Sequence, residues 1–425
     1  MSGAQPSTGA PSVGGVPLDR CLPALRALEP RAQACYVYDL DALDARARRF
    51  AAAFAPLGAL CAYALKANAL AALLERLRER GFGADAVSLG ELELAAAAGF
   101  RAPARVLNGN GRTVAEADWV AREGVALVNA DLVEELDLLQ AAAARAERRV
   151  RVALRVNPGV ETAGHRYIAT GDDEAKFGIA PPEALEAWAA RARWPRLDVD
   201  GIHVHVGSQI LDPVPLERSL EVALELAAES ARRGSPLGLV NLGGGFGVDY
   251  EGRGVEFPLE RYAAGVLARA AGRGLAWVVE PGRWLVAPVG MLVCEVLWVK
   301  RRGARRFVVL SAGMNDLIRP ALYHARHRIV ALRPRPGALE PAMVVGPVCE
   351  SADLFAEDAP LPPLEPGDPV ALLDAGAYGA AMASTYNGRG RLAELVAEGG
   401  RLTRARAGET PADLAARTRN DTIAW

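Results

Sequence analysis

A lysine follows a short apolar segment in the stretch Tyr63-Ala-Leu-Lys66-Ala-Asn68. Burying an unpaired ammonium group is costly, so lysine is rare at the buried end of a strand. A lysine whose pKa is lowered by such an environment can form a Schiff base with a carbonyl compound. A surface lysine just past a strand end is the alternative interpretation, and this stretch alone does not separate the two.

Two histidines precede a serine in the stretch His203-Val-His205-Val-Gly-Ser208. At positions i and i+2 of a strand, both imidazoles point to the same side. They could bind a metal, bond to the backbone at a strand end, or stack on a flat cofactor ring while Ser208 donates to a phosphate. No third ligand of matching spacing is evident, so we expect no metal site.

Two glycine-containing stretches could bind an anion. The run Gly243-Gly244-Gly245 lets backbone N–H groups converge on an anion, although such a run is usually a turn. It matches neither a Walker loop nor the dinucleotide fingerprint. In Glu280-Pro-Gly282-Arg283, a strand-end carboxylate could hold a pyridinium nitrogen, and the glycine and arginine suit phosphate or carboxylate. A surface turn with a solvated ion pair is the commoner fate of this tetrapeptide.

The second half of the chain has polar stretches where core strands should end. They are 315–323, which contains Arg319 and Tyr323, 346–353, which contains Cys349 and Glu350, and 374–379, which contains Tyr378. Taken singly, each is more often structural than functional, and Cys349 could be an inert buried thiol.

The elements that must position these residues alternate from about residue 39 to residue 283. Short apolar runs at 60–64, 84–87, 105–107, 126–128, 152–156, 201–205, 239–242 and 276–280 are followed by amphipathic helical stretches at 40–54, 71–80, 89–97, 133–148, 181–192, 215–233 and 259–273. This alternation predicts a parallel (β/α)₈ barrel, with a doubly wound open sheet as the alternative. The later runs at 290–299, 306–310, 342–345 and 369–373 predict a mostly β domain.

Length and composition indicate a two-domain globular protein. The chain has 425 residues, 51% hydrophobic, with a net charge of −2, which gives no reason to expect nucleic-acid or membrane binding. Its five cysteines form no CxxC pair and suit reduced thiols in a cytoplasm. We expect a flexible tail at 1–16, a segment at 17–38 that joins the β domain, the barrel at 39–285 and the β domain at 286–425.

Taken together and in this order, the motifs resemble the fold type III pyridoxal-phosphate-dependent decarboxylases, which have an alanine-racemase-like barrel, and within them the branch that acts on diaminopimelate. The resemblance covers roughly residues 36–395. The stretches specific to that branch are 155–158, 165–171, 176–178, 203–211, 313–320, 349–351 and 382–387.

The resemblance implies pyridoxal 5′-phosphate as cofactor and a role for each matched residue. Lys66 forms the Schiff base, and Cys349 donates the proton. The other cofactor contacts are Asp85, Arg155, His205, Ser208, Gly244, Gly245, Glu280, Gly282, Arg283 and Tyr378, with Glu91 as a further supporting group. Arg283, Arg319, Tyr323, Glu350 and Tyr378 contact the substrate. The family also implies a homodimer whose active sites are shared between subunits.

The implied reaction is decarboxylation of meso-2,6-diaminopimelate to L-lysine and CO₂. A decarboxylase for ornithine, lysine or a secondary-metabolite precursor is the alternative, and Arg319 favours a substrate with a distal carboxylate. Glu280 disfavours a racemase, and Lys66 with Cys349 disfavours a non-catalytic homologue. The chain departs from the family at Gln33-Ala-Cys35, at Ser311 and at Gly388-Arg389-Gly390.

Overall fold

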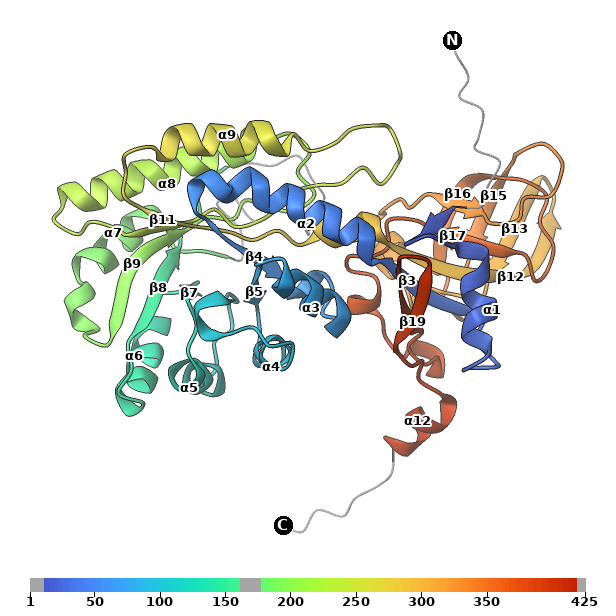
Figure 1. Cartoon of the computed structure of the whole chain (residues 1–425), viewed down its shortest axis with the longest axis horizontal. Coiled ribbons are helices and arrows are strands. Elements are labelled where there is room, and N and C mark those ends of the chain that lie inside the picture. Colours follow the sequence, from blue (N-terminus) through green and yellow to red (C-terminus); the bar gives the residue numbers. More distant parts are fainter. Residues whose placement is uncertain (1–10, 161–176, 419–425) are drawn as a thin grey trace. The chain divides into compact units, whose positions relative to one another are not determined.

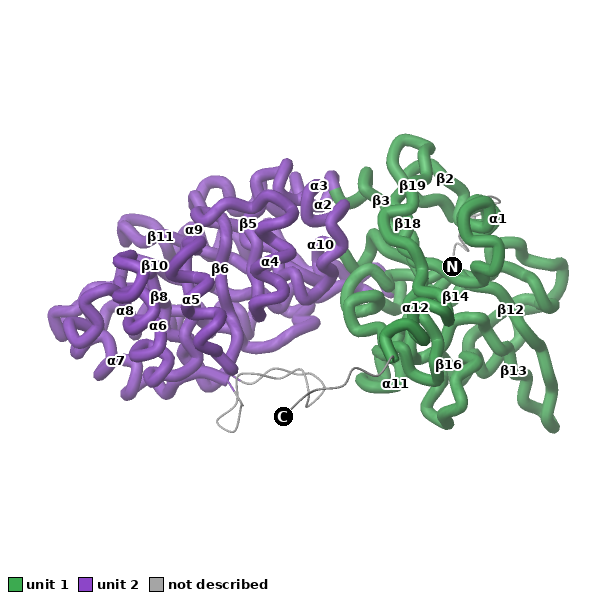
Figure 2. Tube along the Cα trace, turned by 90° about the horizontal axis from the view of Figure 1, so that it is seen from below, with its two compact units in different colours: residues 1–43, 250–252, 286–425 green, residues 44–249, 253–285 purple. Residues whose placement is uncertain are grey.

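The chain forms two compact units, which are coloured separately in Figure 2. The computed structural model describes residues 11–160 and 177–418. One unit contains residues 1–43, 250–252 and 286–425, and the other contains residues 44–249 and 253–285. The family-specific stretch at 165–171 and Lys176 lie outside the described residues.

In the described part of the second of these units, eight parallel strands close into a barrel. In chain order they are β4 (Leu60–Ala64), β5 (Gly83–Ala86), β6 (Arg105–Leu107), β7 (Leu127–Ala130), β8 (Val150–Arg155), β9 (Leu197–His203), β10 (Leu239–Asn241) and β11 (Ala276–Val279). Because β11 pairs with β4, the sheet has no open edge. The barrel prediction is therefore confirmed, and the doubly wound open sheet is wrong.

Helices precede, connect and follow the barrel strands, and the larger ones lie outside them in Figure 1. They are α2 (Leu40–Phe54), α3 (Ala71–Glu79), α4 (Leu89–Ala97), α5 (Val114–Glu123), α6 (Glu135–Arg145), α7 (Pro181–Ala189), α8 (Val214–Arg232), α9 (Leu259–Ala270) and the short α10 (Arg283–Val286). Helix α5 was not predicted from the sequence. A capping box starts it, in which the Thr113 side chain accepts from the backbone of Glu116 and the Glu116 side chain accepts from the backbone of Thr113.

Small and branched apolar side chains fill the barrel interior. A buried cluster joins Ala62, Val106, Leu127, Ala153, Leu239 and Val278, one from each of six strands. Gly201 lies against this cluster, since an added Cβ would stand 2.7 Å from the Cβ of Ala153. This packed interior leaves no place for polar side chains there, so they gather at the strand ends.

A large mixed sheet forms the β domain. Its main path runs β16 (Leu354–Leu361), β15 (Glu340–Val345), β13 (Arg305–Leu310), β12 (Gly290–Arg302), β3 (Ala34–Asp39), β18 (Ala393–Glu398) and β19 (Arg401–Arg406), and β17 (Pro369–Leu372) and β14 (Ile329–Ala331) pair beside β12. The strand expected at residues 36–38 thus lies inside the sheet, between β12 and β18. The strands β14, β16, β18 and β19 were not predicted from the sequence.

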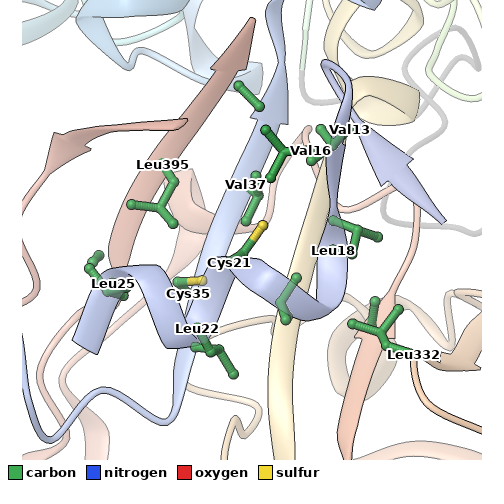
Figure 3. Packing of buried hydrophobic residues seen from close by; sticks show 14 residues of the cluster. Val13, Val16, Leu18, Cys21, Leu22, Leu25, Cys35, Val37, Leu332 and Leu395 are labelled. Carbon is green, nitrogen blue, oxygen red and sulfur yellow. The ribbon is translucent and has the colours of Figure 1, made fainter. Parts of the chain in front are cut away.

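The described part of the expected N-terminal tail is ordered, contrary to expectation. Strands β1 (Ser12–Val13) and β2 (Val16–Pro17) pair as a hairpin, and α1 (Cys21–Arg26) follows. Val13 and Val16 are buried with Leu18, Cys35 and Val37 in one cluster of the β domain (Figure 3). Alternating apolar residues in a Gly-rich stretch can form a hairpin when a neighbouring sheet buries them, and composition alone missed this.

Within residues 11–160 and 177–418, no helix combines the length and the apolarity needed to cross a membrane.

Candidate active site

A ring of polar side chains lies at the carboxyl ends of the barrel strands. Each strand contributes one member within two residues of its last residue: Lys66 after β4, Asp85 on β5, Asn108 after β6, Asn129 on β7, Arg155 on β8, His203 on β9, Asn241 on β10 and Glu280 after β11. In a closed parallel barrel these ends converge on one rim, which is where barrel enzymes place their chemistry.

Lys66 lies in a short 3₁₀ turn, Leu65–Ala67, directly after β4. Its side chain is exposed, whereas Leu65 and Ala67 on either side are buried. A hydrogen bond stabilises this turn, because the Tyr63 hydroxyl donates to the carbonyl of Asn68 at 2.8 Å. The amine is therefore presented to an approaching carbonyl compound by a rigid strand end.

Glu280 is a buried carboxylate held by neutral donors. Its Oε1 accepts from the side-chain amides of Asn241 at 2.6 Å, Asn108 at 2.8 Å and Asn129 at 3.2 Å, and Oε2 lies 3.5 Å from Nε2 of His203. Burial alone would raise the pKa of Glu280, but the His203 imidazole and the amide hydrogen bonds outweigh it and lower that pKa. Glu280 is therefore an anion at neutral pH.

Asp85 is a second buried carboxylate, and its pKa is shifted in the opposite direction to that of Glu280. Burial and the nearby charge of Glu280 raise its pKa well above the ordinary value, although Lys66 and a hydrogen bond from Asn108 oppose this. Two adjacent carboxylates with pKa values pushed apart can take different roles at one pH. Glu280 is the fixed anion, and Asp85 is the group that holds a proton more readily.

His205 and Arg155 flank these carboxylates. His205 Nδ1 accepts from the backbone N–H of Gly244 at 3.1 Å, so the ring proton of the neutral imidazole is on Nε2. Desolvation, Lys66 and Arg155 hold the pKa of His205 well below its usual range. Arg155 pairs with Asp131 at 3.3 Å. A neutral imidazole of fixed tautomer offers a flat face to a ligand ring.

The glycine run brings backbone unusually close to the strand ends. An added Cβ at Gly244 would stand 2.2 Å from the carbonyl oxygen of Glu280, and Gly245 has φ +102°. The N–H of Gly244 is already donated to His205, so this glycine orients the imidazole. Beside the loop, Arg283 Nη2 donates to Oγ of Ser208 at 2.9 Å. These donors suit an anion at this rim.

In the β domain, Arg319 is a buried cation held between two rings. It begins α11 (Arg319–Tyr323), its Nη1 lies 2.7 Å from Nε2 of His327, and its guanidinium carbon lies 4.2 Å from the ring centroid of Tyr250. Nδ1 of His327 lies 2.8 Å from the carbonyl oxygen of Leu373, which can only accept. His327 is thus the neutral Nδ1–H tautomer, and its Nε2 accepts from Arg319.

The other expected residues of the β domain are more open. Tyr323 and Tyr378 are half-buried, and Cys349 and Glu350 are exposed. The backbone N–H of Cys349 donates to Oδ1 of Asn387 at 2.7 Å. Tyr378 has φ +59°, which is uncommon for a bulky residue and often marks a functional constraint.

The three departures from the family pattern are linked through Ser311. The Ser311 hydroxyl donates to the carbonyl of Gln33 at 2.7 Å, and Arg389 donates to the carbonyl of Ser311 at 2.8 Å. Ser311 also accepts from the backbone N–H of Glu295 at 3.0 Å. These positions therefore form one local arrangement within the β domain.

Sequence reasoning missed several members of these clusters. Asn108, Asn129 and Asn241 were passed over because single asparagines belong to no motif, and His327 and Tyr250 because they lie far apart in the chain. The available signal was position, since a polar residue at the end of every predicted barrel strand is expected to face the same rim.

These residues fit a flat ring that carries a phosphate. A buried anion can bind a ring nitrogen, an exposed lysine can bind a carbonyl carbon, a neutral imidazole can stack, and the Cβ-free glycine loop with Ser208 can approach a phosphate. Residues 40–287 match the family described as pyridoxal-dependent decarboxylase, pyridoxal binding domain. Fold and match together define the class as a barrel-type pyridoxal-dependent decarboxylase.

Proteins that are similar in sequence and structure identify the family within this class. The chain is 38% identical to a diaminopimelate decarboxylase of Helicobacter pylori over 89% of this chain and 94% of that protein. It is 40% identical to one of Neisseria meningitidis over 88% of this chain and 92% of that protein. The crystal structure of a Helicobacter pylori diaminopimelate decarboxylase complexed with L-lysine has a TM-score of 0.87 at 36% identity, covering 93% of this chain and 98% of that one. The chain belongs to the diaminopimelate decarboxylase family, which confirms the resemblance seen in the sequence.

The close approach of Gly244 generates a prediction. In Gly244→Ala the new Cβ must displace the loop from Glu280 and withdraw the donor to His205, so we expect affinity for pyridoxal 5′-phosphate to fall on the order of tenfold or more. Binding is measured from the visible absorbance of the bound cofactor. Gly111→Ala is the matched control, because a Cβ there meets open space. Equal affinity of both variants would contradict the role of this contact.

Proposed function

We propose that the chain decarboxylates meso-2,6-diaminopimelate to L-lysine and CO₂ with pyridoxal 5′-phosphate. The observation that carries the proposal is the strand-end ring, in which an exposed Lys66 and a buried anionic Glu280 belong to one rim. The named relatives, alike over nearly the whole chain, support the same substrate. We place this biosynthetic enzyme in the cytoplasm, where its free thiols stay reduced.

The barrel residues would hold the cofactor at three points. Lys66 would bind its carbonyl carbon, His205 would stack on its ring, and Glu280 would accept from its ring nitrogen. Asp85, Glu91 and Arg155 would support them, and the phosphate would be held by Ser208, Gly245, Gly282, Arg283 and Tyr378, with Gly244 acting through His205. When bound, pyridoxal 5′-phosphate supplies a conjugated, electron-accepting ring that stabilises the electron pair left by departing CO₂.

Proton delivery would fall to Cys349. Burial raises the pKa of the Cys61 thiol to about 12 and, with Asp19, that of Cys21 to about 12, and it raises those of Cys35 and Cys294 as well. These four thiols are buried, whereas Cys349 is exposed. Cys349 is thus the thiol that a substrate can reach, and its backbone is held in place by Asn387.

Substrate recognition would depend on the charges of the β domain. Arg319, with Arg283 and Tyr323, would bind the distal carboxylate of the substrate, Glu350 its distal ammonium group, and Tyr378 would also contact the substrate. His327 and Tyr250 hold the guanidinium of Arg319 in place. A guanidinium fork fixed in this way suits a carboxylate.

We expect CO₂ and L-lysine from meso-diaminopimelate, and far less CO₂ from L-ornithine or L-lysine, when the purified protein and cofactor are given each amino acid separately. Lys66→Ala is the control, and it should lose both turnover and the visible band of the bound cofactor. Turnover of ornithine or lysine without turnover of meso-diaminopimelate would instead establish the alternative function, a decarboxylase for another amino acid.

Arg319→Gln is expected to raise KM for meso-diaminopimelate on the order of tenfold or more, because a charge-assisted contact to the distal carboxylate is lost. His327→Ala should raise KM in the same direction but by less, since it only frees Arg319 to move. His324→Asn, at the exposed end of the same helix, is the control and should behave as the parent. An unchanged KM in Arg319→Gln would exclude this role.

We further propose a homodimer in which Cys349 and Glu350 of each subunit act in the active site of the other. Lys66→Ala and Cys349→Ala proteins are then each inactive, but a mixed dimer contains one intact site. We expect decarboxylation to return when the two are co-expressed. The control is co-expression of Lys66→Ala with the variant that carries both Lys66→Ala and Cys349→Ala, and this mixture should stay inactive. Mixed dimers that form without activity would refute the sharing of sites.

A further inference from the structure

Three asparagine side chains converge on one oxygen atom of Glu280. Asn241, Asn108 and Asn129 donate to Oε1 at 2.6, 2.8 and 3.2 Å. They come from three separate barrel strands, and all three are buried. Three N–H donors on one carboxylate oxygen leave it with little capacity for a further partner, whereas Oε2 faces His203 at the longer distance of 3.5 Å.

The partners of two of these amides fix which way each side chain points. Oδ1 of Asn241 accepts from the backbone N–H of Gly243 at 3.0 Å, and Oδ1 of Asn108 accepts from the amide of Asn129 at 2.8 Å. Turning either amide over would set its oxygen against an oxygen of Glu280 and its NH₂ against another donor. The NH₂ groups of Asn241 and Asn108 therefore point toward the carboxylate of Glu280.

Asn129 shows that the arrangement serves the carboxylate more than the fold. Its amide donates to Glu280 and to Asn108, but its own Oδ1 is buried and has no hydrogen-bond partner among the described residues. A buried acceptor without a partner is unfavourable, and an apolar residue of similar size would avoid it. The contribution of Asn129 to this site is therefore made by its N–H donors and not by its oxygen.

Neutral donors matter because charged groups surround Glu280. Asp85 from β5, Arg155 from β8 and His203 and His205 from β9 and its end all face this carboxylate. Asn108 also donates to Oδ1 of Asp85 at 2.6 Å and so bridges the two carboxylates. Amides do not titrate, so they stabilise the anion at every working pH.

We propose that Asn108, Asn129 and Asn241 are positioning residues that saturate Oε1 of Glu280, keep this carboxylate anionic, and leave Oε2 for the ring nitrogen of the cofactor. The inference rests on the proposed function. In a buried site, a proton between a carboxylate and a pyridine nitrogen can reside on either one. Donors to the carboxylate lower its basicity, so the proton stays on the nitrogen, where it makes the ring a stronger electron acceptor.

The test places an isotopic label at the ring nitrogen of pyridoxal 5′-phosphate and measures its NMR chemical shift in the holoenzyme. The parent should show a protonated nitrogen. Each asparagine-to-alanine variant should shift toward the unprotonated value, because the lost donor raises the pKa of Glu280 by about one unit or more. The donor distances predict the order Asn241→Ala, Asn108→Ala, Asn129→Ala, with kcat falling on the order of tenfold for the first and KM nearly unchanged.

The control is Ser230→Ala, which removes a buried hydrogen bond from Ser230 to the carbonyl of Ser235 in the same unit. It should keep the parent chemical shift whatever stability it loses. Circular dichroism and thermal unfolding of each variant show that it is folded before its chemical shift is compared.

The two proposals fail in different ways. A parent that binds no cofactor through Lys66 overturns the proposed function, and this inference with it. A parent with a protonated ring nitrogen, together with folded Asn129→Ala and Asn241→Ala proteins of unchanged chemical shift and kcat, overturns only the positioning role.

Discussion

Closure of the parallel barrel is the constraint on which the barrel unit depends. Since each strand pairs with two neighbours, eight carboxyl ends meet at one rim, and the apolar cluster inside the barrel excludes polar groups from the interior. Residues from β4 to β11 become neighbours only through that closure. The lysine, the two carboxylates and the asparagines owe their proximity to it.

Hydrogen bonds stabilise the buried charge at this rim, and the two buried carboxyl groups there have pKa values shifted in opposite directions. Glu280 remains an anion because amides and an imidazole outweigh its desolvation, whereas Asp85 beside it has a raised pKa. The same surroundings hold His205 neutral. One environment thus produces an anion, a more basic carboxyl group and an uncharged imidazole within a few strand ends.

The β domain contains a buried cation, Arg319, that is held between two rings. His327 is anchored to the carbonyl of Leu373 and accepts from Arg319, and the ring of Tyr250 covers the guanidinium. These two rings fix the position of the guanidinium. The contacts among Gln33, Ser311 and Arg389 show that the unusual positions of this chain form one arrangement of their own.

Local pattern was enough to determine the alternation of strands and helices from the sequence, including β4 and α2 to the residue, because the periodicity of apolar side chains is a property of neighbours in the chain. Short motifs at strand ends were likewise enough to point to Lys66, His205 and Glu280 and to the family. Tertiary structure alone decided which isolated polar residues join them. Asn108, Asn129 and Asn241 acquire a common partner only when distant strands close, and the tautomer of His327 is set by the carbonyl of Leu373, 46 residues further along the chain. The hairpin at Ser12–Pro17 needs the sheet that buries it. In each case the deciding contact links residues far apart in the chain, and such contacts leave no periodic mark in the sequence.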